Sequence, residues 1–335
     1  MIALMLLACD GDAPETTPDV TAPPPATPAE PVVIYSGRSE SLVGEMFLKL
    51  EQVTGVDVDV RYGDTPELVT LMLTEGEQSP ADIIFAQDSG HLGALANQDR
   101  LATLDSALLA QADARFQDPA GRWVGTSGRA RVLVYNTEAL SAETLPASLK
   151  DLADPQWKGK LGWAPGNGSF QAHVSALRHI WGEDETKAWL AAVQANAPAV
   201  YPKNSPQVEA AAKGVIQIGW VNHYYLYRSK TDGYTADNHS FATAGDAGNV
   251  LMLAGMAIRK GSQRTEDAST VISWMLSEEA QRHFANHNFE YPTRPGVSTH
   301  ADVPALDTLH LAEVNQDWLA DLGPTRVMLQ ELGLL

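Results

Sequence analysis

The chain has 335 residues, which is enough for two domains of ordinary size or for one large domain. Hydrophobic residues make up 44% of it and charged residues 19%, a balance that supports folded cores and excludes an intrinsically disordered chain. The formal net charge of −19 argues against nucleic acid and anionic membrane surfaces as partners. The same charge also fits a surface that simply keeps the protein soluble.

The N-terminus carries the only cysteine, Cys9, so the body of the chain has no thiol site and no intramolecular disulfide. Leu6-Leu7-Ala8-Cys9 resembles the lipobox of bacterial lipoproteins, although no Lys or Arg precedes it. The resemblance implies a lipoprotein-type signal over residues 1–8 and a lipidated Cys9. Residues 9–31 are rich in Pro, Thr and Ala, which predicts a disordered linker. No later segment is long and apolar enough to span a bilayer.

Strand and helix patterns alternate after the linker. Strands are predicted at 32–35, 56–62 and 82–85, with helices from Leu42 to Val53 and over 65–77, which is a parallel α/β unit. Polar side chains follow the strand ends and should share one edge of the sheet. They are Arg38, Ser39, Glu40, Tyr62, Gln87 and Asp88.

A glycine-rich loop over 165–169 joins a predicted strand at 161–164 to a predicted helix at 170–181. Free N–H groups at such a helix start suit a small anion, although an ordinary strand-to-helix turn has the same pattern. Further on, 250–258 reads as an apolar strand that crosses back between two domains, and 268–285 reads as a helix.

The residues Asn222, His223, Tyr224 and Tyr225 follow a predicted buried strand over 213–220. Open α/β sheets place ligands at strand ends, and adjacent phenols are hydrogen-bonding and metal-ligating groups. The pair taken alone also fits one core ring beside one surface ring.

Signatures of enzymes are missing from the sequence: it has no Gly-x-Ser-x-Gly elbow, no phosphate-binding loop of the Walker type and no Gly-x-Gly-x-x-Gly after a strand. His283 and His287 have the spacing of two zinc ligands on a helix but lack the catalytic glutamate between them, so we interpret them as surface or packing residues. We therefore expect a binding protein and not an enzyme.

Six motifs in unbroken order resemble the periplasmic ferric-ion-binding proteins of iron ABC transporters. They are Tyr-Ser-Gly-Arg at 35–38, Arg-Tyr-Gly-Asp-Thr at 61–65, Ser-Pro-Ala-Asp at 79–82, Ser-Gly-Arg-Ala-Arg at 127–131, Lys-Asn-Ser at 203–205 and Asn-His-Tyr-Tyr at 222–225. The resemblance implies an α/β, two-lobed periplasmic-binding-protein fold of type II, hinged around a ligand cleft. We expect lobe 1 over 32–127 plus 252–300, and lobe 2 over 128–251 plus 301–335.

The resemblance also implies ligands. Tyr224 and Tyr225 would bind Fe³⁺ as phenolates, because a bound cation lowers a phenol pKa that is otherwise near ~10. A synergistic carbonate or phosphate would lie on five matching positions, namely Asn167, Gly168, Ser169, Asn204 and Asn222.

Lobe 1 departs from the family pattern, since Ser39 and Gln87 stand where relatives have a ligating histidine and glutamate. Glu40 and Tyr62 are the further candidate metal ligands. The other expected cleft residues are Arg38, Ser39, Gln87, Asp88, Arg129 and His223.

The sequence thus predicts a monomeric, extracytoplasmic carrier, anchored through Cys9, that delivers Fe³⁺ to an ABC permease and its ATPase. One alternative is the same fold binding a small organic or anionic solute without metal. A hydrolase or transferase, and a tethered sensor, are the others.

Overall fold

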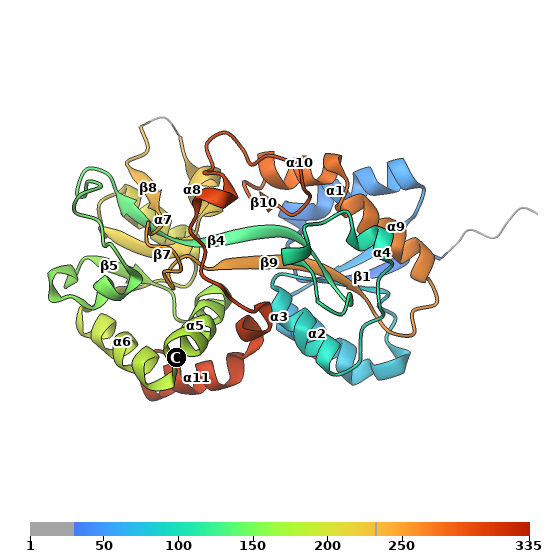
Figure 1. The fold of residues 1–335 in the computed structure, drawn as a ribbon, viewed down its shortest axis with the longest axis horizontal. Helices are drawn as coiled ribbons and strands as arrows, with labels where there is room; N and C mark the ends of the chain where they lie inside the picture. The colour runs from blue at the N-terminus through green and yellow to red at the C-terminus, as the bar shows by residue number, and fades with distance from the viewer. Residues whose placement is uncertain (1–29, 232) are drawn as a thin grey trace, which may run out of the picture. The chain divides into compact units, whose positions relative to one another are not determined.

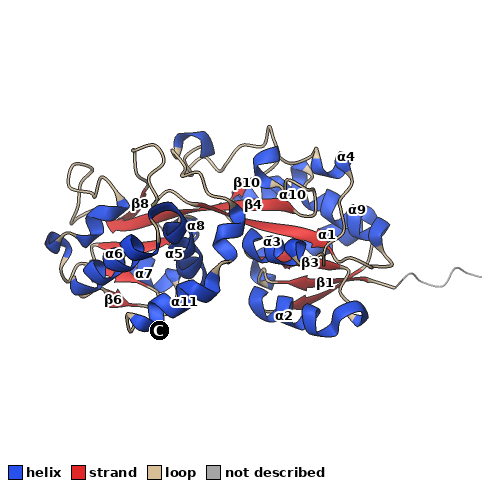
Figure 2. Ribbon diagram, turned by 60° about the horizontal axis from the view of Figure 1, so that its bottom comes forward, coloured by secondary structure: helices blue, strands red, loops and turns tan. Residues whose placement is uncertain are grey.

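A mixed sheet forms the framework of the protein (Figures 1 and 2). The computed structural model describes residues 30–231 and 233–335, and within them ten strands join in this sheet. The predicted signal over 1–8, Cys9 and nearly all of the linker lie outside the described residues. Among the described residues, no helix is both long enough and apolar enough to cross a membrane.

The strands, in chain order, are β1 (Val32–Ser36), β2 (Val58–Tyr62), β3 (Ile83–Ala86), β4 (Val124–Asn136), β5 (Leu161–Trp163), β6 (Ala199–Val200), β7 (Ile218–Asn222), β8 (Ala236–His239), β9 (Leu251–Ile258) and β10 (Tyr291–Pro292). The α-helices are α1 (Glu40–Thr54), α2 (Thr65–Glu75), α3 (Ser89–Asn97), α4 (Ser106–Leu109), α5 (Gly168–Trp181), α6 (Glu183–Ala195), α7 (Asn204–Ala212), α8 (Tyr224–Ser229), α9 (Thr265–Met275), α10 (Glu278–Asn286) and α11 (Leu322–Glu331). Short 3₁₀ helices are η1 (Gly76–Gln78), η2 (Ala114–Phe116), η3 (Leu149–Ala153), η4 (Pro155–Trp157), η5 (Leu306–Thr308) and η6 (Gln316–Ala320).

The strand order is β2-β1-β3-β9-β4-β7-β5-β6, and β8 and β10 also pair with β4. Strand β1 is parallel to β2 and β3, which confirms the parallel unit predicted near the N-terminus. Strand β9 is antiparallel to β3 and β4. The long strand β4 pairs with β9 through residues 124–130 and with β7 through 131–135, so it belongs to both ends of the sheet. We call β1, β2, β3, β9 and β10 the first half and β5 to β8 the second half; β4 and β9 run across the middle in Figure 1.

Helices cover both faces of each half, so the strands are buried on both of their faces. In β1, Val32 and Ile34 pack in the core formed with α1, α9 and α10, whereas Tyr35 packs with α2 and α3. In β4, Leu133 faces α5 and α6, and Val134 faces α7. This alternation is the two-residue period of a strand, and burial on both sides explains why these strands read as continuous apolar runs.

Two predicted elements have different boundaries. The strand expected over 213–220 begins only at Ile218, because Gly214 adopts a positive φ of 67° in the turn that follows α7. The helix expected over 268–285 is two helices, since α9 ends at Met275 and the hydroxyl of Ser277 caps α10. Asn222 is therefore the last strand residue, and Tyr224 begins α8.

Candidate functional site

The tyrosine pair lies where β7 turns into α8. The rings of Tyr224 and Tyr225 stack with centroids 4.3 Å apart and an interplanar angle of 28°. Tyr224 is 1% exposed, whereas Tyr225 is half-buried. Within the described residues, neither phenol hydroxyl has a hydrogen-bond partner that satisfies normal geometry. The two phenol rings thus lie side by side at the turn from β7 into α8.

The buried phenol of Tyr224 is neutral. Burial raises the pKa of Tyr224, the neighbouring Tyr225 raises it further, and the positive charge of Arg129 opposes them. A ligand that needs a phenolate must therefore supply positive charge of its own.

Arg131 of β4 organises the predicted anion residues. It is 1% exposed, and its Nη1 donates to Asn222 Oδ1 at 3.0 Å, to Ser169 Oγ at 3.3 Å and to Asn204 Oδ1 at 3.4 Å. Its Nη2 donates to the carbonyl of Trp220 at 2.9 Å. One guanidinium therefore brings together side chains from α5, α7 and β7.

The loop before α5 completes this cluster. Asn167 caps the helix, and its Oδ1 accepts from the Ser169 amide at 3.1 Å and from the Ser169 hydroxyl at 2.6 Å. Asn204 Nδ2 reaches Ser169 Oγ at 3.3 Å. The Cα of Gly168 faces open space, since a Cβ there would meet nothing within 4 Å. The structure thus places all five predicted anion residues around one helix start.

Arg131 forms no ion pair with any residue that the structure describes. Burial lowers the pKa of Arg131 to about 9, with Tyr225 opposing the shift and the charge of Arg129 adding to it, and Arg131 Nε has no hydrogen-bond partner within the described residues. An unpaired buried cation is costly, so this position favours a negatively charged ligand. The sequence interpretation omitted Arg131 from the site, although Arg129 and Arg131 are two residues apart on one strand and so share a face.

A second arginine cluster lies in the first half of the sheet. Arg38 Nη2 donates to both carboxylate oxygens of Glu290, at 2.6 and 2.8 Å, and both side chains are fully buried. Arg38 Nη1 donates to Gln87 Oε1 at 3.0 Å, and Arg129 donates to the carbonyl of Gln87. Three predicted cleft residues are thus brought together through Gln87, and Glu290, which the sequence interpretation missed, pairs with Arg38.

Asp88 caps α3 next to this cluster. Its carboxylate accepts from the His91 amide at 3.3 Å and pairs with His91 Nδ1 at 2.6 Å. Burial raises the pKa of Asp88, but the charge and hydrogen bond of His91, with Arg129, outweigh it, so the carboxyl pKa is lowered. Conversely, burial lowers the pKa of His91 and Asp88 raises it, with a net increase. Both shifts favour the charged forms of Asp88 and His91, and so the ion pair between them.

The remaining first-half candidates form a separate group. Ser39 and Glu40 are exposed at the start of α1, and Tyr62 is half-buried at the end of β2. Burial raises the pKa of Tyr62, and the charge of Glu40 adds to the increase. A Cβ on Gly44 would lie 3.1 Å from Glu40 Cγ and 3.9 Å from the Tyr62 hydroxyl, so the two candidate ligands are neighbours. Within the described residues, no hydrogen bond or ion pair joins them to Tyr224 or Tyr225.

His223 connects strands. Its Nδ1 accepts from the Ala130 amide at 3.1 Å, its Nε2 donates to the Phe289 carbonyl at 2.7 Å, and its ring stacks on Tyr291 at 4.7 Å. Burial lowers the pKa of His223 to about 4. The ring is therefore neutral, with both nitrogens engaged on backbone groups.

Known proteins share this architecture. Residues 78–320 match the family described as bacterial extracellular solute-binding protein. The chain belongs to this family. The Fe(3+)-binding periplasmic protein of Serratia marcescens is 33% identical over 313 residues, which cover 91% of this chain and 90% of that protein.

Solved structures agree with this assignment. Iron-bound HitA from Pseudomonas aeruginosa matches with a TM-score of 0.84 and 28% identity over 90% of this chain and 99% of that one. Apo ferric ion-binding protein A from Pasteurella haemolytica matches with a TM-score of 0.82 and 26% identity over 91% and 98%. The predicted family resemblance and the α/β binding-protein fold are confirmed. This extracellular solute-binding protein is a binding protein and not an enzyme, as predicted.

Proposed function

We propose that the protein captures ferric iron with the phenolate oxygens of Tyr224 and Tyr225, as the substrate-binding component of an iron ABC transporter. The relatives named for ferric-ion or iron binding support this proposal. The observation that carries it is the stacked tyrosine pair, whose hydroxyl groups lack partners within the described residues and lie in the field of buried guanidinium groups.

The chemistry of the phenol pair suits a trivalent cation. Phenolate is a hard anionic oxygen ligand, and a highly charged cation offsets the burial that otherwise keeps Tyr224 protonated. Binding should therefore release protons. Two phenolates do not balance a trivalent ion beside Arg129 and Arg131, so further negative charge should enter the site with the iron.

We propose that a synergistic carbonate or phosphate supplies this charge. It would accept hydrogen bonds from the start of α5, formed by Asn167, Gly168 and Ser169, with Asn204 and Asn222 beside it. Arg131 would provide the neutralising cation, because its guanidinium already contacts three of these side chains.

Ligands from the first half would complete the site on closure. We propose two lobes, 32–127 plus 252–300 and 128–251 plus 301–335, that close about the strands crossing the middle of the sheet. Glu40 and Tyr62 are the proposed further metal ligands. The proposed cleft lining is Arg38, Ser39, Gln87, Asp88, Arg129 and His223.

A ferric titration tests the proposal. Adding a ferric chelate to metal-free protein with bicarbonate or phosphate should give a visible phenolate-to-iron charge-transfer band. Tyr224→Phe and Tyr225→Phe should each weaken or remove the band, whereas Tyr227→Phe, on the same helix α8, should keep it. A colourless wild-type mixture without a thermal shift would refute ferric binding.

A second candidate is a small anionic solute bound without metal, which the unpaired guanidinium of Arg131 favours. Thermal-shift screening of phosphate and organic anions in the presence of a metal chelator distinguishes it. Stabilisation that is lost in Arg131→Met and unaffected by Tyr225→Phe would support this alternative over ferric capture.

Delivery completes the proposed function. The carrier would work outside the cytoplasm as a monomer, pass iron to the permease and ATPase of the transporter, and be held at the membrane by lipid on Cys9. Radiolabelled palmitate incorporation in wild type but not in Cys9→Ser tests the anchor. Absence of label from the wild-type protein would contradict it.

A further inference from the structure

The short helix η6 lies between the two halves of the protein. It packs on α3 of the first half and on α5 of the second, and the C-terminal segment that contains it runs between these helices before α11 in Figure 1. Both partner helices begin in the candidate site, since Asp88 caps α3 and Asn167 caps α5. A segment that contacts both helices can influence how far apart the two parts of the site lie.

The contact with α3 depends on two glycines. A Cβ added to Gly90 would lie 2.7 Å from Ala320 Cβ and 2.8 Å from Ala320 Cα, and still closer to the Ala320 amide nitrogen. A Cβ added to Gly93 would clash with Asp317 Oδ1 and lie 3.0 Å from Asp317 Cγ. The glycines are three residues apart and share one face of α3, so η6 packs into the space where side chains would otherwise lie. We call this face of α3, at Gly90 and Gly93, the seat of η6.

Polar contacts fix the register of this seat. The Ser89 hydroxyl donates to Gln316 Oε1 at 2.7 Å, and Gln316 Nε2 donates to the Leu251 carbonyl of β9 at 3.2 Å. Ser89 is fully buried. One side chain of η6 thus links the first turn of α3 to β9, near the middle of the sheet.

The contact with α5 is made by apolar and aromatic side chains. Leu319 is fully buried in a cluster with Ala172 and Ala176 of α5. Trp318 stacks on His179 with centroids 5.0 Å apart and planes 6° apart. These apolar and stacking contacts anchor η6 on the second half.

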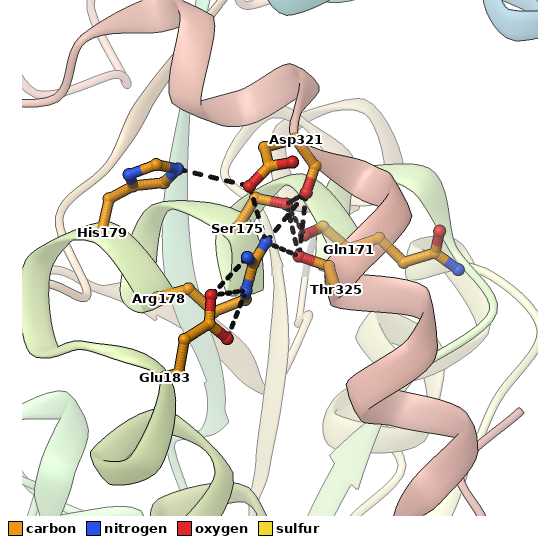
Figure 3. A network of polar contacts seen from close by, with 7 residues as sticks. All are labelled: Gln171, Ser175, Arg178, His179, Glu183, Asp321 and Thr325. Atoms are coloured by element: carbon orange, nitrogen blue, oxygen red, sulfur yellow. Dashed lines mark hydrogen bonds and ion pairs between the residues drawn. The ribbon is translucent and has the colours of Figure 1, made fainter.

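The residues that follow η6 strengthen this anchor. Arg178 Nη1 donates to the Asp321 carbonyl at 2.9 Å and to Thr325 Oγ1 at 2.9 Å, and Ser175 Oγ contacts Thr325 Oγ1 at 2.7 Å (Figure 3). Arg178 also pairs with Glu183. Only Arg178 of the ion-paired groups is buried, but the network has several charge-assisted hydrogen bonds, whereas within the described residues the α3 seat has one direct side-chain hydrogen bond. We therefore expect the α3 seat to separate first.

We propose that η6 is a clasp: it is carried by α5 and α11, and it docks on the Gly90–Gly93 face of α3 to hold the halves in the arrangement that retains the ligand. Gln316 and Asp317 are then positioning residues for the site, although they do not touch the ligand. Because opening would separate α3 from η6, weakening the seat shifts the population toward the open form and speeds release. The effect on ferric ion rests on the proposed function, whereas the effect on opening does not.

Alanine substitutions at the seat test the clasp. Gly90→Ala meets the backbone of η6 and cannot be relieved by a side-chain movement. Gly93→Ala meets the side chain of Asp317, so Gly93→Ala/Asp317→Ala should restore docking, because no remaining atom then lies nearer to the new Cβ than Asp317 Cβ at 3.7 Å. Alanine favours a helix over glycine, so damage to α3 itself does not account for a loss. Gly323→Ala in α11 is the matched control, since a Cβ there meets nothing within 4 Å.

Two readouts separate the clasp from ferric binding. Small-angle scattering of the ligand-free variants should give a larger radius of gyration for Gly90→Ala and Gly93→Ala, with the wild-type value restored in the double variant. Release of ferric ion to a competing chelator should be about tenfold faster in the two single variants, within the usual range of coupling between sites, with association within about threefold. Gly323→Ala should match wild type in both.

Unchanged radius and release rate in Gly93→Ala, or failure of Asp317→Ala to restore them, would overturn the clasp. If Gly90→Ala does not fold, the Gly93 series still decides. If the wild type binds no ferric ion, the proposed function fails, and the clasp is supported or overturned by the radius of gyration alone.

Discussion

Replacing Arg131 by Met separates a ligand-binding role from a structural one. The substitution removes the buried charge and keeps much of the volume of the side chain. It leaves Ser169, Asn204 and Asn222 without their shared donor. We expect a small change in the free energy of unfolding and a large loss of anion-dependent ferric affinity.

The structure gives the magnitudes. A pKa lowered from 12.5 to about 9 means that the folded protein holds this charge at a cost of roughly 5 kcal/mol. The four hydrogen bonds of Arg131 contribute about 1.5 kcal/mol each at the low end for charged donors, or about 6 kcal/mol. The two terms nearly cancel, so the unfolding free energy should fall by no more than about 2 kcal/mol.

The contribution of Arg131 to the binding free energy of an anion has no such compensating cost. A unit anion about 4 Å from the guanidinium gains about 4 kcal/mol at the effective dielectric constant of a partly buried site. Arg131→Met should therefore weaken ferric binding in phosphate or bicarbonate by at least about a hundredfold. Charge-transfer titrations measure the affinity, and urea unfolding measures the stability.

Arg282→Met is the matched control, because the Arg282 side chain is 64% exposed on α10 and pairs with Glu278. It should change neither quantity appreciably. An affinity of Arg131→Met within about fivefold of wild type would refute the anion role. A loss of more than about 4 kcal/mol in unfolding free energy would instead make Arg131 a structural residue.

Three further substitutions test the electrostatics. Glu290→Gln leaves the buried charge of Arg38 without its ion-pair partner. It should lower the free energy of unfolding, measured in urea, by about 3 to 5 kcal/mol. His91→Gln should flatten the pH dependence of the melting temperature above about pH 6.5. The raised pKa of His91 adds stability that is complete below the pKa of His91 in the unfolded chain and is lost as the pH rises through its pKa in the folded protein. The lowered pKa of Asp88 adds stability above about pH 4 that is lost as the pH falls. His173 is buried with its pKa lowered to about 3, so wild type should lose up to about 1.4 kcal/mol per pH unit on acidification below about pH 6.5, and His173→Gln should lose less.

Each expectation has an outcome that contradicts it. If Glu290→Gln unfolds like wild type, or Arg38→Met/Glu290→Gln recovers none of the lost stability, the ion pair is not what holds this region. Parallel melting profiles of His91→Gln and wild type between pH 6 and 8 would exclude the His91 ion pair. For His173, identical acid-unfolding midpoints in the variant and wild type would show that the ring is protonated freely in the folded state.

Local patterns in the sequence predicted most elements and the position of the tyrosine pair. Tyr224 and Tyr225 follow a buried strand, and Asn167 precedes a helix that it caps, because strand periodicity and capping chemistry act over a few residues. Because these patterns are local, the predicted ends of two elements were wrong. The positive φ of Gly214 makes β7 begin later than predicted, and Ser277 divides a predicted helix in two. The family resemblance and the fold are confirmed, and the roles of individual residues in binding stay predictions.

Tertiary structure alone decided which side chains meet. The sequence places Arg129 and Arg131 on one face of β4, but Arg131 reaches Asn222 only because these two residues are paired in the β4–β7 register, and a slip of one residue would turn the guanidinium to the other face. Arg38 and Glu290 are 252 residues apart, so no local pattern joins them. The sequence by itself thus determined which chemical groups are present and in which local element. The register of β4 and the packing between distant segments decided that an arginine stands at the centre of the candidate anion site.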